Sequence, residues 1–79
     1  MNIKILGSGC KNCVALERNT REALAAMDLA AEVIKVTDYP TIASYGIMKT
    51  PGLVVDEQVI VSGRVPKPAE IKELLTALA

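Results

Sequence analysis

The chain has no histidine, phenylalanine or tryptophan, and it has only two cysteines. Without histidine it can form neither a Ser-His or Cys-His nucleophile pair nor a zinc site of two cysteines and two histidines. The two sulfurs and the carboxylates are therefore the only strong metal ligands available. We expect no bound metal and no organic cofactor, so any chemistry must come from the chain's own side chains.

An excess of charge and a long apolar run are also missing. Nine Lys and Arg residues balance nine Asp and Glu residues, so no basic excess favours nucleic acid as a partner. No apolar stretch approaches the roughly 20 residues that span a bilayer. The apolar start of the chain, residues 1–6, is too short for a signal peptide. We therefore expect no membrane association and a cytoplasmic location.

The two cysteines, Cys10 and Cys13, follow an apolar run and a Gly-Ser-Gly loop and begin a helical pattern. In the cytoplasm a structural disulfide is disfavoured, and a Cys-x-x-Cys pair is more often catalytic or metal-binding. A helix N-terminus favours negative charge, which lowers the pKa of a thiol placed there and supplies a thiolate near neutral pH. The thiolate is the reactive species in disulfide exchange. The spacing therefore predicts dithiol chemistry, with metal binding and inert buried thiols as the alternatives.

The hydrophobic pattern predicts a single α/β domain over residues 1–79 with the element order β-α-β-α-β-β-α. A strand, a helix of about sixteen residues and a second strand form a parallel βαβ unit. A short helix capped by Asp38, an antiparallel hairpin and an amphipathic helix beginning near Pro68 follow. The expected elements are strand 2–6, helix 11–27, strand 31–37, a short helix through residue 45, strands 53–55 and 59–62, and a C-terminal helix from residue 68.

This order, with Cys-x-x-Cys at the first strand-to-helix junction, resembles the minimal thioredoxin fold. Residues 45–51 are similar to the Tyr-Gly-Ile-x-x-x-Pro stretch of thioredoxins. Ser62 and Gly63, followed by the terminal helix, are similar to the family's last strand, glycine and helix. The resemblance covers nearly the whole chain and lacks the N-terminal strand and helix of full-length thioredoxins. It is greatest to the small thioredoxin-like redox-active disulfide proteins of bacteria and archaea.

The resemblance implies a four-stranded mixed sheet with helices on both faces and a cis peptide bond before Pro51. It implies a thiol-disulfide oxidoreductase in which Cys10 attacks a partner disulfide and Cys13 resolves the mixed disulfide. Thr50 would pair through its backbone with an extended substrate segment, Pro51 would keep that surface open and exclude metal ions, and Gly63 would leave room for the partner's chain. The implied partners of such a monomer are protein disulfides and a reductase that supplies electrons, such as thioredoxin reductase.

Several positions depart from the family pattern. Gly9 precedes the first cysteine where thioredoxins have Trp, and Lys11 and Asn12 replace Gly-Pro between the cysteines. Lys4 stands six residues before Cys10, where thioredoxins bury an Asp that assists proton transfer. The chain also lacks the glutaredoxin pattern of Val before the cis proline and Gly-Gly-x-x-Asp after it, which argues against glutathione binding.

A soft-metal carrier is the alternative function. Small copper chaperones also place Cys-x-x-Cys between a first strand and a first helix, and two thiolates suffice for Cu(I). Those carriers have a Met two residues before the first cysteine, where this chain has Ser8, and their order is β-α-β-β-α-β. Two interpretations of Lys11 also stay open: a solvated surface lysine, or a cation that favours the Cys10 thiolate.

Overall fold

The structure is a computed structural model that describes residues 2–47 and 49–78. Its elements follow the predicted order, and their bounds agree with the predicted ones to within one residue. They are β1 (Asn2–Leu6), α1 (Lys11–Ala26), β2 (Glu32–Val36), α2 (Tyr39–Ser44), β3 (Gly52–Val55), β4 (Gln58–Ser62) and α3 (Pro68–Leu78). Among the described residues, no helix is both long and apolar enough to cross a membrane.

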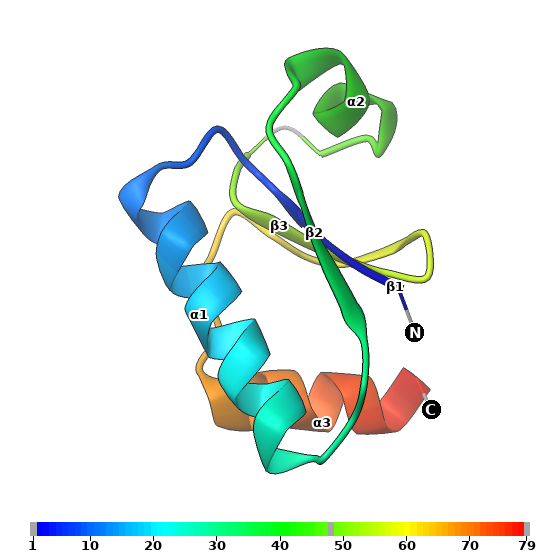
Figure 1. Cartoon of the computed structure of the whole chain (residues 1–79). Coiled ribbons are helices and arrows are strands. Elements are labelled where there is room, and N and C mark those ends of the chain that lie inside the picture. Colours follow the sequence, from blue (N-terminus) through cyan, green and yellow to red (C-terminus); the bar gives the residue numbers. More distant parts are fainter. Residues whose placement is uncertain (1, 48, 79) are drawn as a thin grey trace.

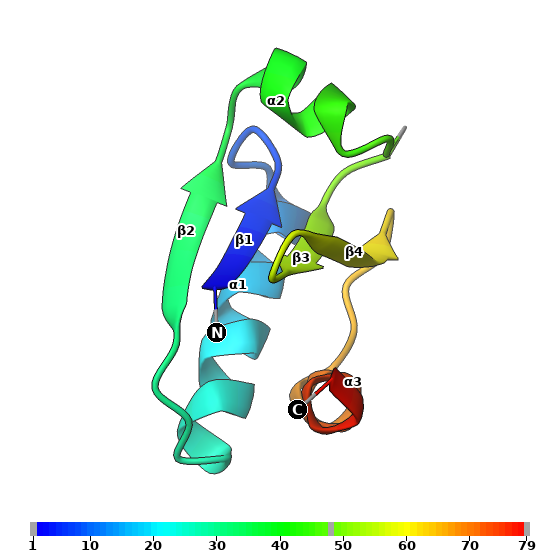
Figure 2. The same cartoon turned by 90° about the vertical axis from the view of Figure 1, so that its right-hand side faces the viewer.

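The four strands form one mixed sheet with the order β2-β1-β3-β4. β1 is parallel to β2, and β3 is antiparallel to both β1 and β4. The parallel pair is joined through α1, which crosses one face of the sheet (Figure 2). The carboxyl ends of β1 and β2 therefore lie at the same edge as the start of β3, and the β1–α1 loop projects from that edge (Figure 1).

Helices cover both faces of the sheet because side chains alternate along each strand. On one face Ile3, Ile5 and Leu53 pack with Leu16 of α1 and Ile71 of α3. On the other face a smaller cluster joins Leu6 and Val54 to Ile42 of α2. This is the architecture expected from the resemblance to the minimal thioredoxin fold, and the prediction of helices on both faces is confirmed.

The short helix α2 begins as predicted. Asp38 is its N-cap and accepts a 2.9 Å hydrogen bond from the Thr41 amide, and Pro40 lies in the first turn. The hydroxyl and amide of Thr41 hold the pKa of the Asp38 carboxyl below its usual value. Gly46, just beyond the helix, has a φ of 80°, a conformation that glycine adopts without strain.

The β3–β4 hairpin is tighter than the sequence predicts. Its turn consists of Asp56 and Glu57, with φ angles of 48° and 71°, and β4 already begins at Gln58. Positive φ at both central positions is the geometry of a type I′ turn, which usually takes Asn or Gly. Here contacts to β1 hold the turn: the Asp56 carboxylate accepts from the Asn2 amide, and Glu57 accepts from Lys4. These contacts with β1 thus stabilise a turn that has no glycine at either central position.

Candidate active site

The β1–α1 loop presents the two cysteines in different surroundings. Cys10 is the exposed N-cap of α1, whereas Cys13 in the first turn is only 5% exposed. The two residues form a disulfide with their Cα atoms 5.0 Å apart. The Cys13 amide donates a 3.2 Å hydrogen bond to the Cys10 Sγ. When the pair is reduced, the same amide and the helix dipole favour a thiolate at Cys10, which is the outer sulfur.

The β1–α1 loop, the first turn of α1 and the segment before β3 meet behind the disulfide. The Thr50–Pro51 peptide bond is cis, and Pro51 is fully buried. A Cβ placed on the buried Gly7 would overlap the Cys13 Sγ, would lie 3.2 Å from the Cys13 Cβ and would be 3.9 Å from the Pro51 Cα. From the sequence, Gly7 is expected only to be part of the loop before Cys10. The residue after β1 must lack a side chain, because the Cys13 sulfur occupies the space that a Cβ would fill. A glycine directly after the first strand is the sequence feature that could have indicated this contact.

The predicted substrate-binding residues lie at one edge of this packing. Thr50 is exposed, and Gly63 donates a 2.8 Å hydrogen bond to the Pro51 carbonyl, so both adjoin the proline. Gly63 has a φ of 77°, and a Cβ there would come within 3.1 Å of the Lys49 Cβ. The space beside Gly63 is therefore taken by the Lys49 side chain, which sequence analysis did not anticipate.

A small cavity of about 50 Å³ opens beside the inner sulfur. It lies between α1 and β2, and its lining includes Cys13, Glu17 and Lys35. The Glu17 carboxylate pairs with Arg21 at 3.0 Å, as its i,i+4 spacing predicts, and with Lys35 at 3.4 Å. Burial alone would raise the pKa of Glu17, but the Arg21 hydrogen bond and the Lys35 charge outweigh it and lower the pKa.

Lys4 does not approach the cysteines, although counting along the sequence places it where thioredoxins bury an acid. Its ammonium donates to the Tyr45 hydroxyl at 2.8 Å and to the Glu57 carboxylate at 2.6 Å, on the face that α2 covers. The hydrogen bonds that it donates to Glu57 and Tyr45 raise the pKa of Lys4. The carboxylate that lies near the inner cysteine is Glu17, which comes from the helix instead of the strand.

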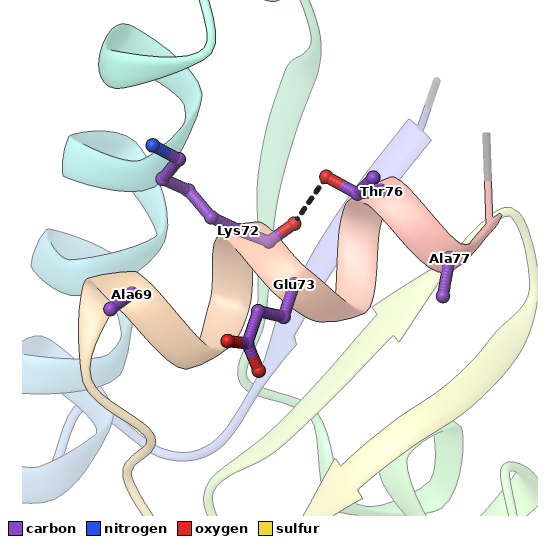
Figure 3. A pocket seen from close by; sticks show the side chains of 5 residues that line it. All are labelled: Ala69, Lys72, Glu73, Thr76 and Ala77. Carbon is purple, nitrogen blue, oxygen red and sulfur yellow. Dashed lines mark hydrogen bonds between the residues drawn. The ribbon is translucent and has the colours of Figure 1, made fainter.

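Two larger hollows are open and shallow, and neither contains a cysteine. One lies on the outer side of α3 (Figure 3), where the Thr76 hydroxyl donates to the Lys72 carbonyl within the helix. The other follows the exposed side of α1 beyond Val14.

Protonation of Glu17 provides a pH test of its ion pairs. Because folding lowers its pKa below the unfolded value of about 4.3, the pairs stabilise the protein above that pH, and the contribution is lost as the pH falls through the folded pKa. Glu17 is 16% exposed, so we expect Glu17→Gln to cost about 1 kcal/mol or less at neutral pH and nothing near pH 2.

Urea unfolding of both proteins across this pH range measures the difference. Glu22→Gln, at an exposed glutamate of the same helix, is the matched control and should change little at any pH. A penalty for Glu17→Gln that stays constant down to pH 2 would show that the side chain acts through packing and not through charge.

The metal-carrier alternative finds no support. In the described parts of the chain, no group of three or more Cys, His, Asp or Glu side chains is arranged to hold a metal ion. The disulfide also engages both sulfurs. Helix α2 lies between the second and third strands, and this order differs from that of the copper carriers.

Comparison with known proteins agrees with the geometry. A family model described as a thioredoxin domain matches residues 1–76. A thioredoxin of Methanothermobacter thermautotrophicus is 41% identical over 76 residues, which cover 96% of this chain and 99% of that protein. A thioredoxin of Methanocaldococcus jannaschii is 37% identical over 73 residues, covering 92% of this chain and 84% of that protein. With its Cys10–Cys13 disulfide at the start of α1, the chain belongs to the thioredoxin family.

Proposed function

We propose that the Cys10–Cys13 pair reduces disulfides of protein partners. The observation that carries the proposal is the asymmetry of the pair: Cys10 is exposed at the helix N-cap and accepts the Cys13 amide, while Cys13 is buried one turn behind it. Exchange must begin at an accessible, ionised sulfur and finish from a second sulfur held within reach. The curated relatives named thioredoxin support this assignment.

The reaction proceeds in two displacements. The Cys10 thiolate attacks one sulfur of the partner disulfide, a Cys10–partner bond forms, and the partner's other sulfur leaves as a thiolate. Cys13 then loses its proton to solvent and attacks the Cys10 Sγ. The Cys10–Cys13 bond forms, the bond to the partner breaks, and its electron pair leaves with the partner's sulfur. The partner gains two electrons, and the protein is oxidised to the disulfide.

The partner's chain would lie across Thr50 and Pro51. An extended segment can pair with exposed backbone groups, which gives affinity with little dependence on side chains. Thr50 is exposed, whereas the next residue, Pro51, is fully buried. The buried proline anchors the segment, and a partner's chain can approach it at Thr50. Gly63 holds this support through its hydrogen bond to the Pro51 carbonyl.

We propose further that the protein works alone and receives its electrons from a separate enzyme. Residues 1–79 act as one thioredoxin-like domain and as a monomer in the cytoplasm. A reductase returns electrons to the Cys10–Cys13 disulfide after each turnover, so the protein carries electrons between that reductase and its substrates. Thioredoxin reductase is the first candidate, because the chain lacks the glutaredoxin residues that hold glutathione.

The test is a coupled assay in which NADPH oxidation is followed spectroscopically. The oxidised protein is offered NADPH with a thioredoxin reductase, and separately NADPH with glutathione and glutathione reductase. We expect turnover with the first system alone, and no turnover of a Cys10→Ser, Cys13→Ser double variant. Turnover with the glutathione system alone would contradict the assignment of the electron donor.

A further inference from the structure

Charge is distributed unevenly in this neutral chain. The segments nearest the disulfide, 7–14, 49–52 and 62–64, contain Lys11, Lys49 and Arg64 but no Asp or Glu. Four carboxylates lie toward the other end of the sheet: Asp28 and Glu32 where α1 leads into β2, and Asp56 and Glu57 in the β3–β4 turn. The loops next to the disulfide therefore carry only cationic side chains, although the net charge of the chain is zero.

Contacts place Lys49 beside Gly63, next to the segment where the partner's chain is proposed to bind. Lys49 precedes Thr50, and its aliphatic chain packs against Gly63, within 3.1 Å of where a Cβ would stand. Gly63 in turn bonds the Pro51 carbonyl, and Pro51 adjoins the inner cysteine. Lys11 is exposed directly after Cys10. Lys11 and Lys49 thus lie on two different segments that flank the disulfide.

Two of the carboxylates nearest this end, Glu17 and Glu70, form ion pairs, whereas Asp38 has only neutral partners and keeps its negative charge. Glu17 pairs with Arg21 and Lys35. Asp38 caps α2 and accepts from Thr41. Glu70 forms a two-pronged pair with Arg64, whose hydrogen bonds lower the pKa of that carboxyl. Within the described residues, Lys11 and Lys49 take part in no ion pair, so their charge is available to a partner.

We infer that this surface selects disulfides that lie in acidic segments, and that Lys49 is a specificity-determining residue. The inference rests on the proposed function. A partner whose cystine is flanked by Asp or Glu would be steered to the cysteine-bearing end, because complementary charge raises the rate of encounter. The exposed carboxylates Asp28, Glu32 and Asp56 at the other end of the sheet would repel the same partner, which favours productive orientation.

The test uses the reduced protein and two synthetic peptides, each with one internal disulfide. The peptides are identical except that the residues flanking the cysteines are Glu in one and Lys in the other. At low ionic strength we expect the acidic peptide to be reduced about tenfold faster. The ratio should fall toward one in about 0.5 M NaCl, because salt screens exposed charges.

Lys49→Gln keeps the Cβ and Cγ methylene groups that pack on Gly63 and removes the charge, and it should lower the ratio roughly twofold to threefold. Lys72→Gln, at an exposed position of α3, is the matched control and should leave the ratio unchanged. Equal rates for the two peptides, or an unchanged ratio in Lys49→Gln, would overturn the inference and leave the proposed function standing. If the protein reduces neither peptide and no other disulfide, the proposed function itself is overturned.

Discussion

Replacing Gly7 with alanine is expected to lower the free energy of unfolding of the oxidised protein by about 1–3 kcal/mol and to slow disulfide exchange. The added methyl group would overlap the Cys13 Sγ and lie 3.2 Å from the Cys13 Cβ. Most overlaps are relieved when a flexible side chain moves. Here the sulfur is fixed by its bond to Cys10, and the Pro51 backbone lies 3.9 Å away. The disulfide or the β1–α1 loop must shift.

Urea unfolding of the oxidised and reduced proteins measures this penalty. It should be smaller in the reduced protein, because the Cys13 side chain can then turn away from the added methyl group. The control is Ser8→Ala at the next, exposed position, which should stay within about 0.5 kcal/mol of the parent. An oxidised Gly7→Ala protein as stable and as active as the parent would show that the contact does not constrain the site.

The element order and the position of the cysteines could be predicted from the sequence, because both depend on local signals. The apolar run before Gly7 and the helical spacing of Leu16 and Leu24 each belong to one segment. Their burial in the core confirms the pattern. The Asp38 cap is local in the same way, since its carboxylate bonds the amide three residues later.

The surroundings of Cys13 could not be predicted, because they are made by side chains that are far apart in the sequence. Glu17 has an evident partner in Arg21, but only the packing of α1 on the sheet brings Lys35 of β2 to the same carboxylate. Counting six residues back from Cys10 led to Lys4, whose side chain lies on the opposite face. A count along one strand identifies a position in that strand, and it does not show which residues of other elements lie near Cys13.

Gly63 shows a second limit of the same kind. Its positive φ and its place after β4 agree with the resemblance, but the sequence does not show that Lys49 fills the space beside it. That contact joins two loops more than ten residues apart in the chain. It also fixes the aliphatic part of the Lys49 side chain beside Gly63.

The two cysteines should behave differently when each is replaced by serine. Cys13→Ser keeps the exposed sulfur that attacks and removes the one that resolves, so covalent mixed disulfides with partner proteins should accumulate. Cys10→Ser leaves only the buried sulfur, which is 5% exposed and cannot reach a partner. We expect roughly tenfold or more trapped partner with Cys13→Ser than with Cys10→Ser.

Trapping by tagged Cys13→Ser, Cys10→Ser and double-serine proteins, seen on non-reducing gels of cell extracts, tests the assigned roles most directly. The predicted result is a set of reducible high-mass bands with Cys13→Ser, almost none with Cys10→Ser, and none with the double variant. Equal trapping by the two single variants, or more trapping by Cys10→Ser, would contradict the roles assigned to Cys10 and Cys13.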